Sequence, residues 1–131
     1  MRILLLVLTS VGLGLSAAAQ DAKSPPQAVR NVLEKHDQSG VDNKEIVIGT
    51  ATLPIGSSIG FHTHAGDETG FVIKGSVTLK TKGQPDRTIV AGQSFFNVRG
   101  AVHSLLAGPE GATVVSTWIV DKGVPLASPV P

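Results

Sequence analysis

Two histidines and a glutamate lie close together in the stretch Gly60–Glu68, which reads GFHTHAGDE. If this stretch forms a strand, His62 and His64 face the same side, because side chains alternate along a strand with a period of two. A turn over Ala65–Asp67 would then bring the Glu68 carboxylate to the same point. Two imidazoles and one carboxylate that leave coordination positions open are a common site for a redox-active or Lewis-acid metal.

A third imidazole, from His103 on a later predicted strand, could complete such a site. Taken one at a time, these residues have more ordinary interpretations. An H-x-H pair is often a surface feature, and a lone glutamate is usually a solvated carboxylate. His36 lies among charged residues in EKHDQSG, and we expect it on the surface. The choice therefore depends on the elements that position these side chains.

The first residues, MRILLLVLTSVGLGLSAAAQ, have the pattern of a secretory signal peptide. Arg2 precedes an apolar run, and the run ends in the small residues Ala17–Ala19. We expect cleavage after Ala19 and export to the periplasm or the outside of the cell. The apolar run is shorter than the roughly 20 residues of a membrane span, so an uncleaved anchor is the less favoured interpretation.

Composition limits the remaining possibilities. The chain has no cysteine, so neither disulfides nor thiolates contribute. Its formal net charge is +1 at pH 7, and removal of Arg2 with the signal peptide brings it near zero. No positive charge is clustered for a nucleic acid or an anionic membrane surface, and we expect neither as a partner of the mature chain.

From Glu45 onward the pattern predicts an all-β fold. Short apolar or alternating runs recur between glycine- and proline-containing turns, as in a sandwich or barrel. The predicted strands are 45–53, 57–63, 70–74, 76–82, 87–90, 94–98, 102–106 and 112–120. Segment 28–38 fits a short helix or a strand equally well. The predicted organisation is a signal peptide (1–19), a leader with an edge strand (20–44), a β-barrel (45–121) and a peripheral proline-rich arm (122–131).

A wider pattern connects the candidate ligands. Gly56, His62, His64, Glu68 and Gly75 form one group, and Gly92, Gly100 and His103 form a second. The two groups resemble the two signature motifs of the cupin superfamily. The first motif is matched at every fixed position. The second departs at Val98, where the family usually has proline, and at Ala107, where it often has asparagine, but neither departure removes a ligand.

This resemblance spans roughly Glu45 to Val120. It implies a small antiparallel β-barrel of two facing sheets, a jelly-roll-like double-stranded β-helix with a metal inside. It also implies four ligands, His62, His64, Glu68 and His103, and a strand at 28–36. Small cupins commonly pair through sheet edges, so the resemblance further suggests a homodimer.

Other residues near the motifs receive structural interpretations. Asn97 and Arg99 could meet a polar ligand, but turn residues are the favoured interpretation. Asp67 is expected to point away from the site. The aromatic residues could line a pocket, although a core role is favoured for each alone; they are Phe61, Phe71, Phe95, Phe96 and Trp118.

The expected cofactor is one divalent transition metal per chain, which could be Fe, Mn, Cu, Zn or Ni. Outside the cytoplasm, raw affinity favours copper and zinc. No dedicated acid–base pair accompanies the predicted ligands, which favours a reaction run by the metal itself. The first hypothesis is a dioxygenase-like oxidoreductase acting on a small chelating or aromatic substrate. The alternatives are an isomerase or lyase, a non-catalytic module that binds a metal or small ligand, and a purely structural barrel.

Overall fold

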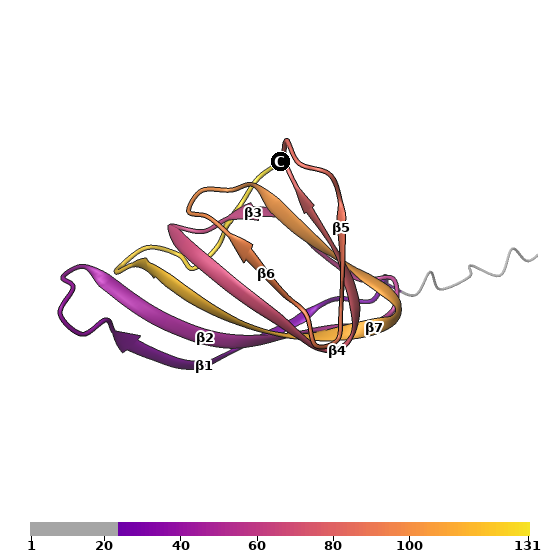
Figure 1. The fold of residues 1–131 in the computed structure, drawn as a ribbon, viewed down its shortest axis with the longest axis horizontal. Helices are drawn as coiled ribbons and strands as arrows, with labels where there is room; N and C mark the ends of the chain where they lie inside the picture. The colour runs from indigo at the N-terminus through magenta and orange to yellow at the C-terminus, as the bar shows by residue number, and fades with distance from the viewer. Residues whose placement is uncertain (1–23) are drawn as a thin grey trace, which may run out of the picture.

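The computed structural model describes residues 24–131, and in that range the chain is all-β (Figure 1). The predicted signal peptide and its cleavage site lie outside the described residues. The strands are β1 (Val29–Asp37), β2 (Lys44–Leu53), β3 (Ser58–Thr63), β4 (Gly66–Thr81), β5 (Arg87–Val90), β6 (Ser94–Asn97), β7 (His103–Asp121) and β8 (Ser128–Pro129). Within the described residues, no helix is long and apolar enough to cross a membrane.

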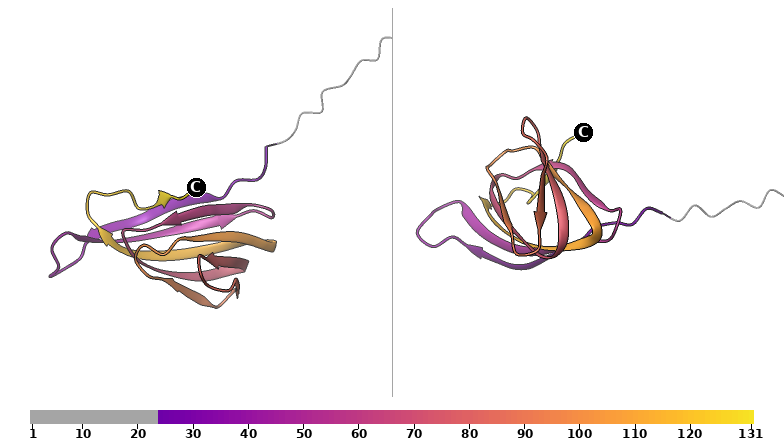
Figure 2. Two further views of the ribbon diagram at one scale, coloured as in Figure 1. Left: turned by 90° about the horizontal axis from the view of Figure 1, so that it is seen from above. Right: turned by 45° about the vertical axis from the view of Figure 1, so that its right-hand side comes forward.

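The strands form two facing antiparallel layers that share β4 and β7. The first half of β4 and the second half of β7 belong to one layer, in the order β1-β2-β7-β4-β6, which we call the first sheet. The other halves form the second sheet, in the order β8-β3-β7-β4-β5. Figure 2 shows the layers from two further directions. This arrangement confirms the predicted jelly-roll-like fold.

A pair of glycines lets the two shared strands bend together. β4 and β7 were each predicted as two strands, but both continue through the expected break. At the bend, Gly75 has φ +69° and Gly111 has φ +73°. A Cβ atom on Gly75 would lie 1.9 Å from the carbonyl oxygen of Gly111. Only glycine combines this backbone conformation with so close an approach. The bend of β4 and β7, which we call the glycine corner, therefore requires glycine at positions 75 and 111.

The apolar core lies between the sheets near this corner. Its buried members are Leu53, Val72, Val77, Leu79, Ile89, Phe95, Leu105, Ala112 and Val114. The Phe95 ring fills the space beside Gly70, where a Cβ atom would lie 2.1 Å from Phe95 Cζ. The packing is therefore tight at the corner end of the molecule.

Several local expectations are corrected. The turn predicted over Ala65–Asp67 is wrong, because β4 already begins at Gly66. The strand that the resemblance implied at 28–36 is present as β1, which runs from Val29 to Asp37 and pairs with β2. Residues 122–131 are not merely peripheral, because β8 pairs with β3. The turn after Val98 closes without proline, through a hydrogen bond from the Ala101 N–H to the Val98 carbonyl of 3.0 Å.

Candidate metal centre

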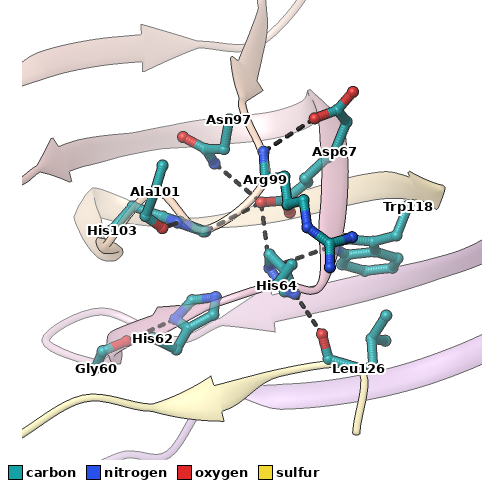
Figure 3. A network of polar contacts seen from close by, with 11 residues as sticks. Gly60, His62, His64, Asp67, Asn97, Arg99, Ala101, His103, Trp118 and Leu126 are labelled. Carbon is teal, nitrogen blue, oxygen red and sulfur yellow. Dashed lines mark hydrogen bonds and ion pairs between the residues drawn. The ribbon is translucent and has the colours of Figure 1, made fainter. Parts of the chain in front are cut away.

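Three histidines, His62, His64 and His103, lie together in one cluster (Figure 3). The register of β4 and β7 places this cluster away from the glycine corner. His62 on β3 lies directly opposite His103 on β7 in the second sheet, and their ring centroids are 4.3 Å apart. His64 follows the end of β3, with its ring 4.8 Å from that of His62 and 5.2 Å from that of His103. All three side chains are buried, and one ligand nitrogen from each lies within 4.8 Å of the others.

Backbone carbonyls orient the three rings. The Nδ1 atom of each histidine lies at hydrogen-bond distance from a carbonyl oxygen, which is Gly60 for His62 (2.8 Å), Ala101 for His103 (2.9 Å) and Leu126 for His64 (2.6 Å). A carbonyl oxygen only accepts, so each Nδ1 carries the proton and donates it. Each Nε2 is then left with a lone pair, which is the arrangement that metal-binding histidines have.

Glu68 approaches the histidines from the first sheet. Its side chain is buried, and its Oε2 atom lies 3.1 Å from His103 Nε2 and 3.4 Å from His64 Nε2. Asn97 Nδ2 donates a hydrogen bond of 2.9 Å to the same oxygen. Burial alone would raise the pKa of the Glu68 carboxyl, but the contacts with His103, His64 and Asn97 outweigh burial and hold this pKa well below its usual range. Glu68 is therefore ionised.

The pKa values of His62 and His103 are shifted in opposite directions by their surroundings. Burial is the main cause that lowers the pKa of His62 below its usual value, and the neighbouring imidazoles lower it further. Burial also acts to lower the pKa of His103, but the Glu68 carboxylate and the Ala101 carbonyl outweigh it and raise that pKa. His62 thus keeps its lone pair free of protons more readily than His103 does.

The donor set fits a divalent transition metal. His103 Nε2 is buried and, although close to Glu68, is not aligned to hydrogen-bond with any of the described residues. A buried polar atom without a partner is rare in a native fold and calls for an explanation. Three convergent imidazole nitrogens beside a carboxylate suit Fe, Mn, Cu, Zn or Ni. The three histidines form a group able to bind a metal ion.

Asn97 and Trp118 were named from the sequence as possible contacts, but a turn role and a core role were favoured for them. Asn97 is buried at the end of β6 and holds the Glu68 carboxylate, so its interpretation as a turn residue is wrong. Trp118 is half-buried on β7, and its Nε1–H lies 3.2 Å from His64 Nε2. Both residues lie opposite Glu68 in the sheet, one on each side. An even spacing from Val114 and Ser116 places Trp118 on the inner face and could have suggested its role.

Arg99 and Asp67 lie outside the cluster, as Figure 3 shows. The Asp67 carboxylate accepts a hydrogen bond of 2.9 Å from the Arg99 backbone N–H. The Arg99 guanidinium donates to the Ala65 carbonyl and to Asp121. These contacts fasten the loop between β6 and β7 to the start of β4. Arg99 is therefore structural, and Asp67 points away from the histidines as expected, from a strand rather than a turn.

A cavity of about 400 Å³ adjoins the histidines. Its apolar wall is mainly aliphatic, with contributions from Ile59, Leu105, Val114 and Leu126. Among the aromatic residues, Trp118 alone is part of the lining. Phe95 belongs to the core, whereas the other three phenylalanines are exposed on the outside. The polar cluster thus opens directly into a mostly apolar space.

Solved structures share this fold. The DMSP lyase DddQ from Ruegeria pomeroyi is 18% identical with a TM-score of 0.66, over 87% of this chain and 56% of that one, so the chain spans little more than half the lyase. A cupin-like protein from Thermotoga maritima is 20% identical with a TM-score of 0.63, over 79% and 75% of the two chains. An oxalate oxidase in complex with glycolate is 19% identical with a TM-score of 0.62, over 87% and 66%.

These identities show the fold alone. No curated protein matches the chain in sequence. The family model of the cupin domain, however, matches residues 49–120. The match includes Glu68 and all three clustered histidines, and it covers more than half of the chain, which therefore belongs to the cupin superfamily.

Proposed function

We propose that this protein is a metal-dependent, dioxygenase-like oxidoreductase that acts on a small substrate able to chelate the metal. One observation carries the proposal: three Nε2 lone pairs, fixed by three backbone carbonyls, converge beside an ionised carboxylate at the wall of a cavity. His62, His64, His103 and Glu68 would hold the ion. The volume of about 400 Å³ lies at the small end of typical ligand sites.

The residues around the ion have distinct tasks. Glu68 offsets part of the charge of a dication that is placed in a buried site, and Asn97 keeps its carboxylate in place. The aliphatic wall keeps bulk water away from the ligands. When bound, a redox-active divalent ion would supply Lewis acidity and electron transfer to dioxygen and a chelating substrate.

The cavity wall favours metal-run chemistry over acid–base chemistry. Within the part of the chain that the structure describes, its titratable groups are the four proposed ligands and Arg30. An arginine guanidinium stays protonated and cannot act as a general base. An isomerase or lyase would therefore have to use one of the proposed ligands to move protons.

The first experiment measures metal in the mature protein, Gln20 to Pro131, isolated from the periplasm or the medium, where we propose that it resides. Mass spectrometry should find close to one transition-metal ion per chain. The His62→Ala/His103→Ala variant should lose the ion. His36→Ala is the matched control, because His36 is exposed and paired with Glu34 away from the cluster, and it should keep the ion.

The second experiment measures oxygen uptake by the Fe, Cu and Mn forms with enediol and catechol-type compounds. Uptake that depends on His62 and His103 supports an oxidoreductase. Metal binding without uptake overturns that assignment. Products found by mass spectrometry would then indicate a lyase or isomerase, and ligand binding without product would indicate a binding module.

We also propose that the chain forms a homodimer through β1. This strand is an edge of the first sheet, and all nine of its residues are exposed, including Val29, Val32 and Leu33. Exposed apolar edge strands are normally covered by a partner. Light scattering should give twice the mass of one chain for the mature protein and the mass of one chain for Leu33→Lys. A monomeric wild-type protein would refute the proposal.

A further inference from the structure

One cation in the cavity wall has no counter-charge. Arg30 on β1 lies opposite Ala51 of β2 in the sheet, and both residues line the cavity. Within residues 24–131, the Arg30 side chain makes no ion pair and no hydrogen bond. By contrast, Lys35, further along the same strand, pairs with Glu45 at 2.9 Å. Arg30 is therefore an exposed residue of the cavity wall whose charge none of the described residues neutralises.

The cavity cannot balance this charge from within. Glu68 is the one carboxylate among the described lining residues, and its Oε2 atom already faces His64, His103 and Asn97. A dication at the histidines together with Arg30 outweighs the single negative charge of Glu68. Positive charge that lines a cleft in this way attracts an anionic ligand. The planar guanidinium fork matches a carboxylate in two parallel hydrogen bonds.

The rest of the wall limits what the anion is attached to. Val32 and Ile59, with Leu105 and Val114, offer apolar surface, and about 400 Å³ is enough for a small molecule only. An inorganic anion would leave this apolar surface against water. A compound with a short carbon body would cover the surface and remove it from water, which is favourable.

We propose that the cavity binds a small organic acid, with a carboxylate on Arg30 and its carbon body against the aliphatic wall. Arg30 is then the residue that selects acids over neutral compounds of the same shape. The inference names the substrate class for the function proposed above and rests on it, because the same cavity would hold the substrate. The second end of the acid would face the histidines.

The test uses diacids and their monoamides. Each of succinate, glutarate and adipate has nearly the same shape as its monoamide and differs from it by one negative charge. The Arg30 variants then show whether Arg30 is the group that recognises this charge. Trp118 is the single tryptophan of the chain and lines the cavity, so its fluorescence can report binding. Titration calorimetry provides an independent measure on the same metal-containing mature protein.

We expect at least one diacid to bind about tenfold more tightly than its monoamide, because a charged hydrogen-bonded pair is lost with the amide. Arg30→Gln should abolish this preference, and Arg30→Lys should keep part of it. Arg87→Gln is the control, because Arg87 lies on β5 and is exposed outside the cavity lining. It should bind like the wild type.

Three outcomes would overturn the inference. These are equal affinity for every diacid and its monoamide, a preference that survives in Arg30→Gln, and no binding of any compound by either method. The metal content of each sample separates this result from the function proposed above. If the protein holds no metal but still prefers diacids through Arg30, the proposed acid site stands and the proposed metal-dependent reaction is refuted. If the protein holds metal but shows no preference for diacids, the proposed metal centre stands and the proposed acid site is refuted.

Discussion

The two ends of the molecule use the same strands for opposite purposes. Near the glycine corner, the inward side chains of β4 are the fully buried Val72 and Val77. Nearer the start of the same strand, the inward side chain is the carboxylate of Glu68. β7 changes in the same way, from Leu105 at the core to His103 at the site. Strand alternation therefore decides which residues face inward, whereas position along the strand decides whether they stabilise the fold or do chemistry.

The difference shows how each end is stabilised. The corner end buries mainly apolar side chains, so packing and the hydrophobic effect dominate there. The open end buries three imidazoles and a carboxylate, which carbonyls, Asn97 and Trp118 hold through hydrogen bonds, except that His103 Nε2 has no partner among the described residues. A metal would bridge the two sheets there, since His62 and His103 belong to the second sheet and Glu68 to the first.

Truncating the core should have the largest effect on stability. Phe95 is 3% exposed and packs on Gly70, so Phe95→Ala should lower the free energy of unfolding by about 3–5 kcal/mol. The adjacent Phe96 is 54% exposed, and Phe96→Ala should change it little. Denaturant unfolding of both variants measures the contrast. Equal losses would mean that the corner is not the main source of stability.

Removing a histidine should instead abolish stabilisation by metal. An ion at a hundred times its dissociation constant raises the free energy of unfolding by about 2.7 kcal/mol. Thermal melts with and without metal should show this gain in the wild type and in His36→Ala, but not in His103→Ala. A gain that persists in His103→Ala would place the metal elsewhere.

The strands and the closeness of His62 to His64 could be predicted from sequence because their signals are local, whereas the grouping of these two with His103 followed from the cupin resemblance. Alternating runs indicate strands, and His62 with His64 is a pair two residues apart. The roles of Asn97 and Trp118 at the site were not favoured because these roles come from register: each residue lies opposite Glu68 on a neighbouring strand. The Leu126 carbonyl that orients His64 was missed because a backbone group leaves no side-chain signal. A local sequence pattern predicts neither the cross-strand pairing with Glu68 nor the backbone contact of His64.

The pair of Glu68 and His103 predicts a pH dependence in the metal-free protein. The pKa of His103 is raised above 6.5, so its contribution to stability is complete below 6.5 and is lost as the pH rises through the raised value. The pKa of Glu68 is lowered, so its contribution is present above the usual 4.5 and is lost as the pH falls through the lowered value. The pair therefore stabilises most between these limits.

The measurement is the difference in free energy of unfolding between the wild type and Glu68→Gln. We expect a larger difference at about pH 5.5 than at about pH 8.5. Taking the difference cancels most of the contribution of His62, whose lowered pKa acts in the opposite sense. A difference that does not change with pH would show that the two groups are not coupled.

The smallest predicted effect concerns Trp118. Its Nε1–H is directed at the lone pair of His64 Nε2 that a metal would use, so binding must break this hydrogen bond. A hydrogen bond contributes about 1 kcal/mol net, and Trp118→Phe should therefore bind metal roughly fivefold more tightly in a competition assay with a chelator. Ser116→Ala is the control, because Ser116 lines the same cavity without this contact. Weaker binding by Trp118→Phe would mean that the indole supports the metal centre instead of competing with it.

In the wild type, the same competition should change the fluorescence of this single tryptophan as metal is added, because the indole N–H loses its acceptor.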